Sequence, residues 1–172
     1  MTQLSMFDPV EIPQTKGQIA IVDPVDADLA AYKWCTECKN LNDHKYAKRR
    51  KPGPKHVYKY LYLHRVVLAR KLGRELAPHE IADHANGNTL DNRRDNLRLA
   101  TKAQNQQNQK LRSNNTSGYK GVHFNKQIGK WGALIHANRQ KFPLGWFDTP
   151  EEASEAYRAA ALKYHNEFAR FK

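Results

Sequence analysis

An aspartate and a histidine, Asp83-His84, stand side by side in the chain, with Asn96 twelve residues after His84 and Asn105 nine residues later. The oxygens of Asp83 and Asn105 are hard ligands that suit Mg²⁺ or Mn²⁺, ions that keep several waters and bind substrate phosphate. A neutral imidazole beside such a ligand can take a proton from water. The chemistry that fits these residues is hydrolysis of a phosphodiester, in which the metal stabilises the scissile phosphate and the leaving oxygen.

A hairpin and a helix must bring these residues together. Asp83-His84 closes a short strand candidate, and the strong turn residues Asn86-Gly87-Asn88 follow it. A second strand candidate ends near Ala100, and residues 101–112 are a Gln/Asn-rich helix candidate. This ββα order would place the end of the first strand and the polar helix face around one small site.

The preceding segments alternate short strands with one helix. The predicted strands are 18–22, 46–48 and 57–63, and the predicted helices are 26–34 and 64–72, the second ended by Gly73. Residues 1–17 show no periodicity and are predicted to form a flexible arm. Together with the hairpin and polar helix, residues 18–112 are predicted to be one domain, with a ββα core at about 60–110.

The C-terminal part has a different texture. A linker is predicted at 113–118 from its Ser, Asn and Gly content, and strands are predicted at 119–124, 130–137 and 140–147. Thr149-Pro150 followed by two acids is typical of a helix start. Three strands and one helix over 119–172 predict a second small domain, and the two domains together give an α+β protein.

Charge narrows the classes of function. The chain has 172 residues, 29 Lys and Arg against 17 Asp and Glu, and a net charge of +12. Residues 44–74 and 96–147 contain no acid, and stretches of this length favour a nucleic-acid partner over a generally basic surface. No apolar run is long enough to cross a bilayer, and the N-terminus does not resemble a secretory signal. A membrane protein and a secreted disulfide-rich protein are therefore excluded.

The run D-H-A-N-G-N-T-L-D-N-R-R-D-N-L-R-L-A-T from Asp83, with Leu63-His64-Arg65 upstream and Q-N-Q-Q-N downstream, resembles the HNH nucleases of the phage and intron-encoded homing type. The resemblance implies that Asp83 and Asn105 are metal ligands and that His84 is the general base. It also implies that Asn96 braces the loop through backbone hydrogen bonds. His64 and Arg65 fall at supporting or phosphate-facing positions, and Ala85 replaces the larger aliphatic residue of many relatives.

Residues 117–172 resemble the Apetala/ethylene-response-factor DNA-binding domain, through S-G-Y-K-G-V, K-W-G-A, L-G-W-F-D-T and the helix that follows. That fold lays a three-stranded sheet in the major groove with a helix behind it. The resemblance implies DNA-facing roles for Lys120, His123, Lys130, Trp131, His136, Arg139 and Lys141. His123, His136 and Pro143 depart from the plant pattern, so the base preference cannot be transferred. Trp146 and Phe147 are predicted to be core residues.

Two further features leave alternatives open. Cys35 and Cys38, with His44, provide three of the four ligands that structural zinc needs, and His56 is a distant fourth. Two reduced thiols are the prediction, and a zinc site is the alternative. Tyrosines interleaved with Lys and Arg over residues 46–62 are predicted to be packing residues, although they also suit a nucleic-acid face.

The sequence thus predicts a site-recognising DNA endonuclease with Mg²⁺ or Mn²⁺, a homing-type nicking enzyme that binds double-stranded DNA as a monomer. Lys110 and Arg112 would contact phosphates between the two domains. The expected location is the cytoplasm of a bacterial host, with a phage or intron origin. The alternative function is a non-enzymatic DNA-binding regulator that uses the HNH unit as a scaffold.

Overall fold

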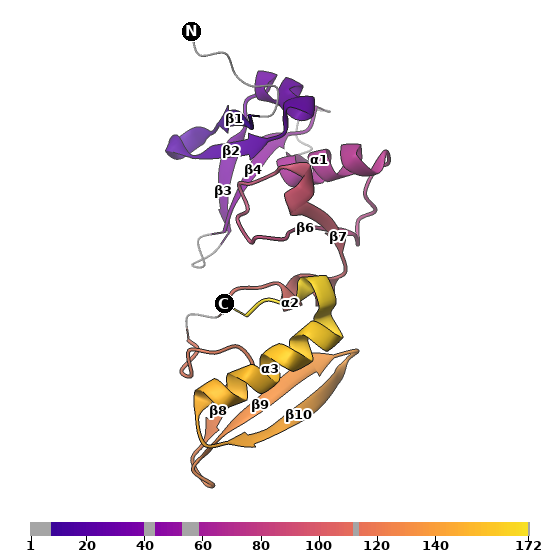
Figure 1. Cartoon of the computed structure of the whole chain (residues 1–172). Helices are drawn as coiled ribbons and strands as arrows, with labels where there is room; N and C mark the ends of the chain where they lie inside the picture. The colour runs from indigo at the N-terminus through magenta and orange to yellow at the C-terminus, as the bar shows by residue number, and fades with distance from the viewer. Residues whose placement is uncertain (1–7, 40–43, 53–58, 112–113, 172) are drawn as a thin grey trace. The chain divides into compact units, whose positions relative to one another are not determined.

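The computed structural model describes residues 8–39, 44–52, 59–111 and 114–171 and divides the chain into two compact units, Met1–Lys102 and Ala103–Lys172. Both units combine helices with antiparallel sheets, which confirms the predicted α+β class (Figure 1). The division falls at the start of helix α2 (Lys102–Gln107), before the 113–118 linker that the sequence predicts. The polar helix therefore belongs to the second unit, together with the C-terminal sheet.

The first unit contains two hairpins, one three-stranded sheet and one α-helix. Its strands are β1 (Val10–Pro13), β2 (Ile19–Val22), β3 (Cys35–Lys39), β4 (His44–Arg50), β5 (Tyr60–Tyr62), β6 (Ile81–His84) and β7 (Leu97–Ala100). Its helices are η1 (Thr15–Gly17), η2 (Pro24–Ala31), α1 (Leu63–Leu72) and η3 (Arg94–Asn96), of which only α1 is an α-helix. The sheets are β1-β2, β3-β4-β5 and β6-β7, all antiparallel. The predicted strands at 18–22 and 46–48 and the helix at 64–72, which Gly73 ends, are confirmed.

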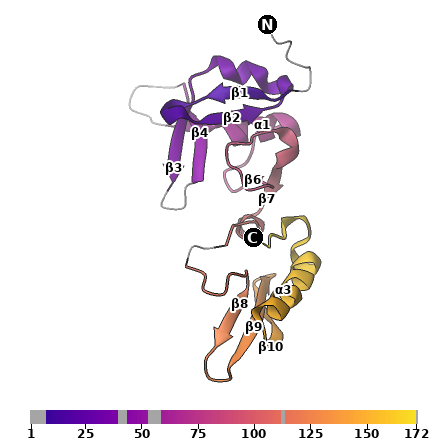
Figure 2. The ribbon, with the colours of Figure 1, turned by 60° about the vertical axis from the view of Figure 1, so that its left-hand side comes forward.

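The flexible arm predicted at the N-terminus is wrong for residues 10–17. β1 pairs with β2 in register, and Ile12, opposite Ala20, is completely buried in the core of this unit (Figure 2). The β1 segment has too few residues for its alternation to show in the sequence. Its partner strand and the core it covers decide its conformation. Residues 1–7 lie outside the described part.

One hydrophobic core holds the first unit together. Trp34, Leu63, Val67 and Leu97 are each at most 1% exposed, and they come from segments spread over the whole unit. The Trp34 indole donates to the carbonyl of Leu29 at 2.8 Å, which satisfies its buried polar atom. Leu29 lies on η2, a 3₁₀-helix over Pro24–Ala31 where the sequence predicts a helix over 26–34.

Asp26, also on η2, is a fully buried carboxylate between two arginines. Arg94 donates to it through Nε at 2.8 Å and through a second nitrogen at 3.1 Å, and Arg70 donates from α1 at 3.2 Å. The backbone N–H of Arg94 also donates to Asp23 at 2.6 Å. A buried charge is tolerated only when such partners offset its lost hydration. Asp26 therefore ties the N-terminal segment to α1 and η3.

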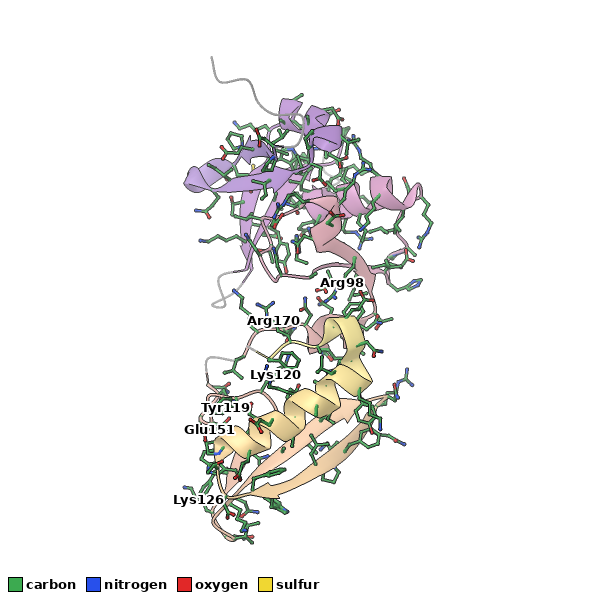
Figure 3. The ribbon with its side chains drawn as sticks, in the orientation of Figure 1. Arg98, Tyr119, Lys120, Lys126, Glu151 and Arg170 are labelled. Atoms are coloured by element: carbon green, nitrogen blue, oxygen red, sulfur yellow. The ribbon has the colours of Figure 1, made fainter. Side chains whose placement is uncertain are left out.

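The second unit is a three-stranded antiparallel sheet with a helix along one face (Figure 1). Its elements are α2, β8 (Val122–Asn125), β9 (Lys130–Ala137), β10 (Gln140–Phe147), α3 (Pro150–His165) and η4 (Asn166–Phe168). α3 begins with a capping box, in which Thr149 and Glu152 each accept from the other's backbone N–H. Tyr119 donates to Glu151 in the same first turn at 3.0 Å (Figure 3). The predicted three strands and helix are confirmed.

No helix in the described part of the chain is long and apolar enough to cross a membrane.

We predict that Asp26→Asn lowers the free energy of unfolding by about 3 kcal/mol or more, because it leaves two arginines facing a neutral group in a buried site. Urea denaturation followed by tryptophan fluorescence measures this change, since Trp34 lies in the same core. Asp28→Asn is the control: Asp28 also pairs with Arg70, but its side chain is 58% exposed, so a small effect is expected. Equal losses for the two variants would contradict the role assigned to Asp26.

Candidate active site

The β6-β7 hairpin places Asp83 and His84 at the end of a strand. In its register Asp83 lies opposite Arg98 and His84 lies opposite Leu97. Asp83 is 5% exposed and His84 4% exposed, so both side chains are buried. Nε of Arg98 (Figure 3) donates to Asp83 Oδ2 at 2.9 Å, which compensates the buried carboxylate.

Asn96 fastens the loop that joins the two strands. Its side-chain oxygen accepts from the backbone N–H of Asn86 at 2.9 Å, and its side-chain nitrogen donates to the carbonyl of Asp91 at 2.7 Å. Its own carbonyl accepts from the N–H of Ala85 at 2.9 Å. Gly87 makes the tight turn, with φ +72° and an N–H that donates to the carbonyl of His84. Asn96 thus connects both sides of the loop to the strand end that carries His84.

Asp91 and Asn92 form the floor of this loop, and sequence reasoning did not assign them a role. Asp91 is 2% exposed and accepts from Arg93 and from the side chain of Asn86. Hydrogen bonding to Arg93 lowers the pKa of the Asp91 carboxyl, with desolvation acting in the opposite direction. Asn92, 1% exposed, contacts the ring of His84: its Oδ1 lies 3.2 Å from Nε2. Both residues belong to the D-N-R-R-D-N run, but Asp and Asn in such a run are equally typical of a turn with no functional role.

The environment of His84 favours the neutral imidazole. Burial lowers its pKa below the ordinary value, and the hydrogen bond that the ring donates to Asn92 opposes this effect only in part. A neutral ring whose Nε2–H donates to Asn92 carries its lone pair on Nδ1. This is the protonation state that a general base needs.

Aromatic rings from three other elements cluster near His84. The ring of His64, in the first turn of α1, has its centroid 5.2 Å from that of His84. Tyr46 on β4 is 5.3 Å from His64 and 6.3 Å from His84, and Tyr62 on β5 is 5.7 Å from His64. The structure therefore brings His64 to the predicted base, as the supporting position implies, together with two tyrosines that the sequence assigned to packing.

Arg65, predicted to face DNA phosphate, is engaged with the protein backbone. Its guanidinium donates to the carbonyls of Glu80, Leu76 and Ala77 at 2.6 to 3.4 Å. These bonds hold the chain after α1 in place before β6 begins. The structure gives Arg65 a structural task in addition to any contact with a ligand.

The predicted metal ligands lie in different units. Asp83 ends β6 in the first unit, whereas Asn105 lies half-buried on α2 in the second, so their joint role stays a prediction. Among the described residues there is no group of three or more His, Cys, Asp or Glu side chains that could hold a metal ion. One carboxylate and one amide oxygen nevertheless fit Mg²⁺, which retains several waters in protein sites. Cys35 is a half-buried free thiol, and the side chains of Cys38 and His44 lie outside the described part.

On the C-terminal sheet, four of the predicted DNA-facing residues are exposed on the strands: His123, Lys130, His136 and Lys141. Three of them lie on the face opposite α3. The adjacent positions Val122, Ile135 and Phe142 pack into the core beneath the helix, so His123, His136 and Lys141 point the other way. Arg139, in the turn between β9 and β10, is also exposed. Lys130 pairs with Asp148 at 3.1 Å.

Of two aromatic predictions on this sheet, the one for Trp146 is wrong. Trp131, predicted to face DNA, packs with Phe147 against the core under α3. Trp146, predicted to be core, is 49% exposed. A Cβ at Gly132, directly across from Trp146 in the register, would lie 2.6 Å from its ring and 2.7 Å from that of His123. Because position 132 has no side chain, both rings can cover it on the open face.

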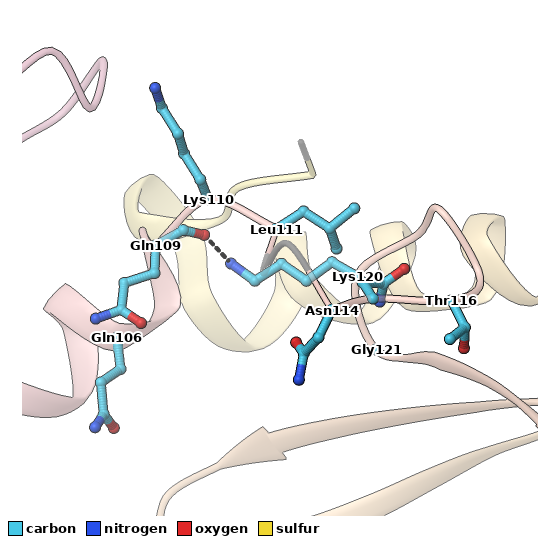
Figure 4. Close-up of a pocket in the computed structure, with 9 residues that line it drawn as sticks. Gln106, Gln109, Lys110, Leu111, Asn114, Thr116, Lys120 and Gly121 are labelled. Atoms are coloured by element: carbon cyan, nitrogen blue, oxygen red, sulfur yellow. Dashed lines mark hydrogen bonds between the residues drawn. The ribbon is translucent and has the colours of Figure 1, made fainter. Parts of the chain in front are cut away.

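Lys120, predicted to face DNA, is engaged with the protein backbone. Its ammonium donates to the carbonyls of Gln107 and of Gln109, the second at 2.9 Å (Figure 4). Desolvation lowers the pKa of Lys120 to about 8. Lys120 therefore fastens the chain after α2 to the start of the C-terminal domain. Lys110, in the same segment, is exposed, and Arg112 lies outside the described residues.

Comparison with known proteins identifies the first unit. The family model for an HNH endonuclease matches residues 61–107, from β5 into α2. Protein 3.8 of Escherichia phage T7 is 36% identical over 90 residues, which cover 52% of this chain and 74% of that protein.

Two AP2/ERF and B3 domain-containing transcription factors of Arabidopsis thaliana are 43% and 44% identical over 49 and 45 residues. These matches cover 28% and 26% of this chain but only 14% and 13% of the plant proteins, so they are partial. The match to the phage protein covers most of that protein, and β6, η3 and α2 carry the HNH pattern that the family model matches. The chain belongs to the HNH endonuclease family.

Proposed function

We propose that this protein is a homing-type DNA endonuclease that hydrolyses one phosphodiester in double-stranded DNA with one divalent metal ion and His84 as general base. The observation that carries the proposal is the state of His84: a buried imidazole held by Asn92, with a pKa lowered by burial, next to Asp83 at the end of a braced hairpin. A histidine that only packs in a core does not need an adjacent buried carboxylate and a loop fastened by so many side-chain hydrogen bonds.

The proposed mechanism assigns each residue one task. His84 takes the proton from the attacking water at Nδ1, while Asn92 fixes the ring through Nε2. Asn96 keeps the loop closed, so that the ring stays aimed. Asp83 and Asn105 would hold Mg²⁺ or Mn²⁺, which stabilises the scissile phosphate and the leaving oxygen when it is bound. Arg98 keeps the Asp83 carboxylate in a fixed position.

We propose further that the C-terminal sheet reads DNA. Its strand order, the helix behind it and the partial AP2/ERF matches support this role. His123, His136 and Lys141 on the open face supply donors and positive charge, and a sheet of this size fits the major groove. The sheet and the nuclease unit differ, so we expect one monomer on an asymmetric site, with one strand nicked. The phage relative favours action inside a bacterial host.

His84→Ala should reduce cleavage of plasmid DNA by about 10²- to 10⁴-fold, the usual contribution of a general base, and leave DNA affinity unchanged. Because burial lowers the pKa of His84, the wild-type rate should stay constant as the pH falls to about 6.5 and decline only below it. This acidic decline should be absent from the residual activity of the variant. A nicking assay across pH, with an electrophoretic binding assay, measures both effects.

His79→Ala is the matched control, because His79 is an exposed histidine of the same unit and should be dispensable. Loss of DNA binding in step with activity in His84→Ala would mean that His84 is structural. Wild-type protein that binds DNA but never nicks it would favour the regulator alternative.

Asn105→Ala should raise the Mg²⁺ concentration that gives half-maximal nicking at least tenfold, because the variant lacks one of the two proposed protein ligands and should bind the metal more weakly. EDTA should abolish nicking by the wild-type protein, and Mn²⁺ should restore part of the activity of the variant. Gln106→Ala changes the next residue of α2, which is exposed, and serves as control. An unchanged Mg²⁺ requirement in Asn105→Ala would remove Asn105 from the ligand set.

Lys141→Ala should weaken binding to duplex DNA and make the slope of log K against log salt shallower by about 0.9, the value for one lost phosphate contact. Fluorescence anisotropy at several salt concentrations measures this slope. Lys163→Ala is the control: Lys163 is an exposed lysine on α3, which covers the opposite face of the sheet. Equal changes in the two variants would show that the open face is not the DNA surface.

A further inference from the structure

A cavity of about 770 Å³ lies on the first unit between β5, α1 and the chain that follows α1. Leu61, Val66 and Leu76 supply apolar surface, and Tyr60 and Tyr62 supply aromatic rings. None of Asp83, His84, Asn96 and Asn105 lines it. The tyrosines are among those that the sequence could assign either to packing or to a nucleic-acid face.

Tyr60 is the accessible ring of the cavity. It is 47% exposed, which is unusual for a tyrosine that serves only to pack the core. The ammonium of Lys48, which is also paired with Glu37, lies 4.2 Å from its ring centroid. Tyr62 differs, because its hydroxyl donates to Glu37 at 2.9 Å and its ring contacts His64.

The rim of the cavity is basic. Arg70 and Arg74 also line it, but both are paired with carboxylates, Asp28 and Glu80 among them. Lys51 is exposed, and the described residues give neither Lys51 nor Arg65 a carboxylate partner. Glu75 is an acid on the rim that partly offsets these charges. Two cations beside an exposed tyrosine and an apolar floor provide attraction for an anion attached to a flat, apolar ring.

We propose that this cavity binds an unpaired nucleotide of a DNA strand. The base stacks on Tyr60 over Leu61 and Val66, and the adjoining phosphates lie near Lys51 and Arg65. Rings of this kind bind single-stranded nucleic acid because any base offers a face for stacking, and a basic groove follows the backbone. A base inside a duplex is already stacked on its neighbours and cannot enter. The proposal rests on DNA as the partner of this family, and not on cleavage.

Full-length protein in EDTA, which prevents cleavage, is titrated against fluorescent oligothymidylate and against a mixed-sequence duplex of equal length. Tyr60→Ala should weaken binding of the single strand about tenfold, equivalent to the stacking of one base, and leave duplex binding within about twofold. Tyr60→Phe, which keeps the ring, should restore single-strand binding. Tyr32→Ala is the control, because Tyr32 is 46% exposed, lies 3.9 Å from the Arg49 guanidinium and does not line the cavity.

Lys51→Ala is a second variant at an exposed position, and a several-fold selective loss of single-strand affinity is expected for it too. Single-strand affinity that is unchanged in Tyr60→Ala overturns the proposal, and so does an equal loss for single strand and duplex. Thymidine monophosphate as competitor distinguishes a nucleotide within a strand from a free nucleotide. Weak competition supports the proposal, and competition as strong as that of oligothymidylate overturns it. Failure of the wild-type protein to nick DNA would contradict the proposed endonuclease activity, but it would not change the outcome of these binding measurements.

Discussion

The buried carboxylate of Asp26 is the interaction on which the arrangement of the first unit depends. A charge with no exposed surface is costly unless its partners are fixed, and Arg94 and Arg70 are those partners. Arg94 lies 68 residues away in the chain, on the short helix that leads into β7. The N-terminal segment, α1 and the end of the site loop must therefore occupy one arrangement for Asp26 to be buried at all.

The order of the site follows from this arrangement. Arg94 opens η3, which also contains Asn96, so the contact that anchors Arg94 also positions Asn96. Asn96 in turn fastens the loop from Ala85 to Asp91, and Asn92 in the same loop reaches the ring of His84. His84, the proposed base, is thus oriented by a series of contacts that starts at Asp26, a carboxylate outside the residues that the family model matches. Because these contacts fix the ring of His84 in advance, the proposed proton transfer would need no reorientation of the side chain.

Fewer cationic side chains are available to a polyanion than the net charge of this protein suggests. Lys120 donates to backbone carbonyls, and Arg98 neutralises Asp83. Their charges hold a loop and a strand end in place, while the exposed cations of the C-terminal sheet and of the cavity rim stay accessible for the DNA contacts that we propose. The position of a cation in the fold, more than the composition, decides whether it meets a phosphate.

The sequence by itself determined the hairpin around Asp83-His84, the α1 helix with its glycine end, and the capped helix behind three strands. Turn residues, caps and short spacings act over a few residues, so they can be recognised in the chain alone. Only the tertiary structure decided that Asn92 holds His84 and that β1 pairs with β2 and buries Ile12. It also decided that Trp146 is exposed while Trp131 packs against the core, and that Lys120 donates to backbone carbonyls. These outcomes depend on which distant segment meets each side chain. The sequence of the strand at 130–137 shows which side chains share a face, but it does not show which face the helix will cover. A lysine in the sequence likewise shows a positive charge but not the group that it will contact.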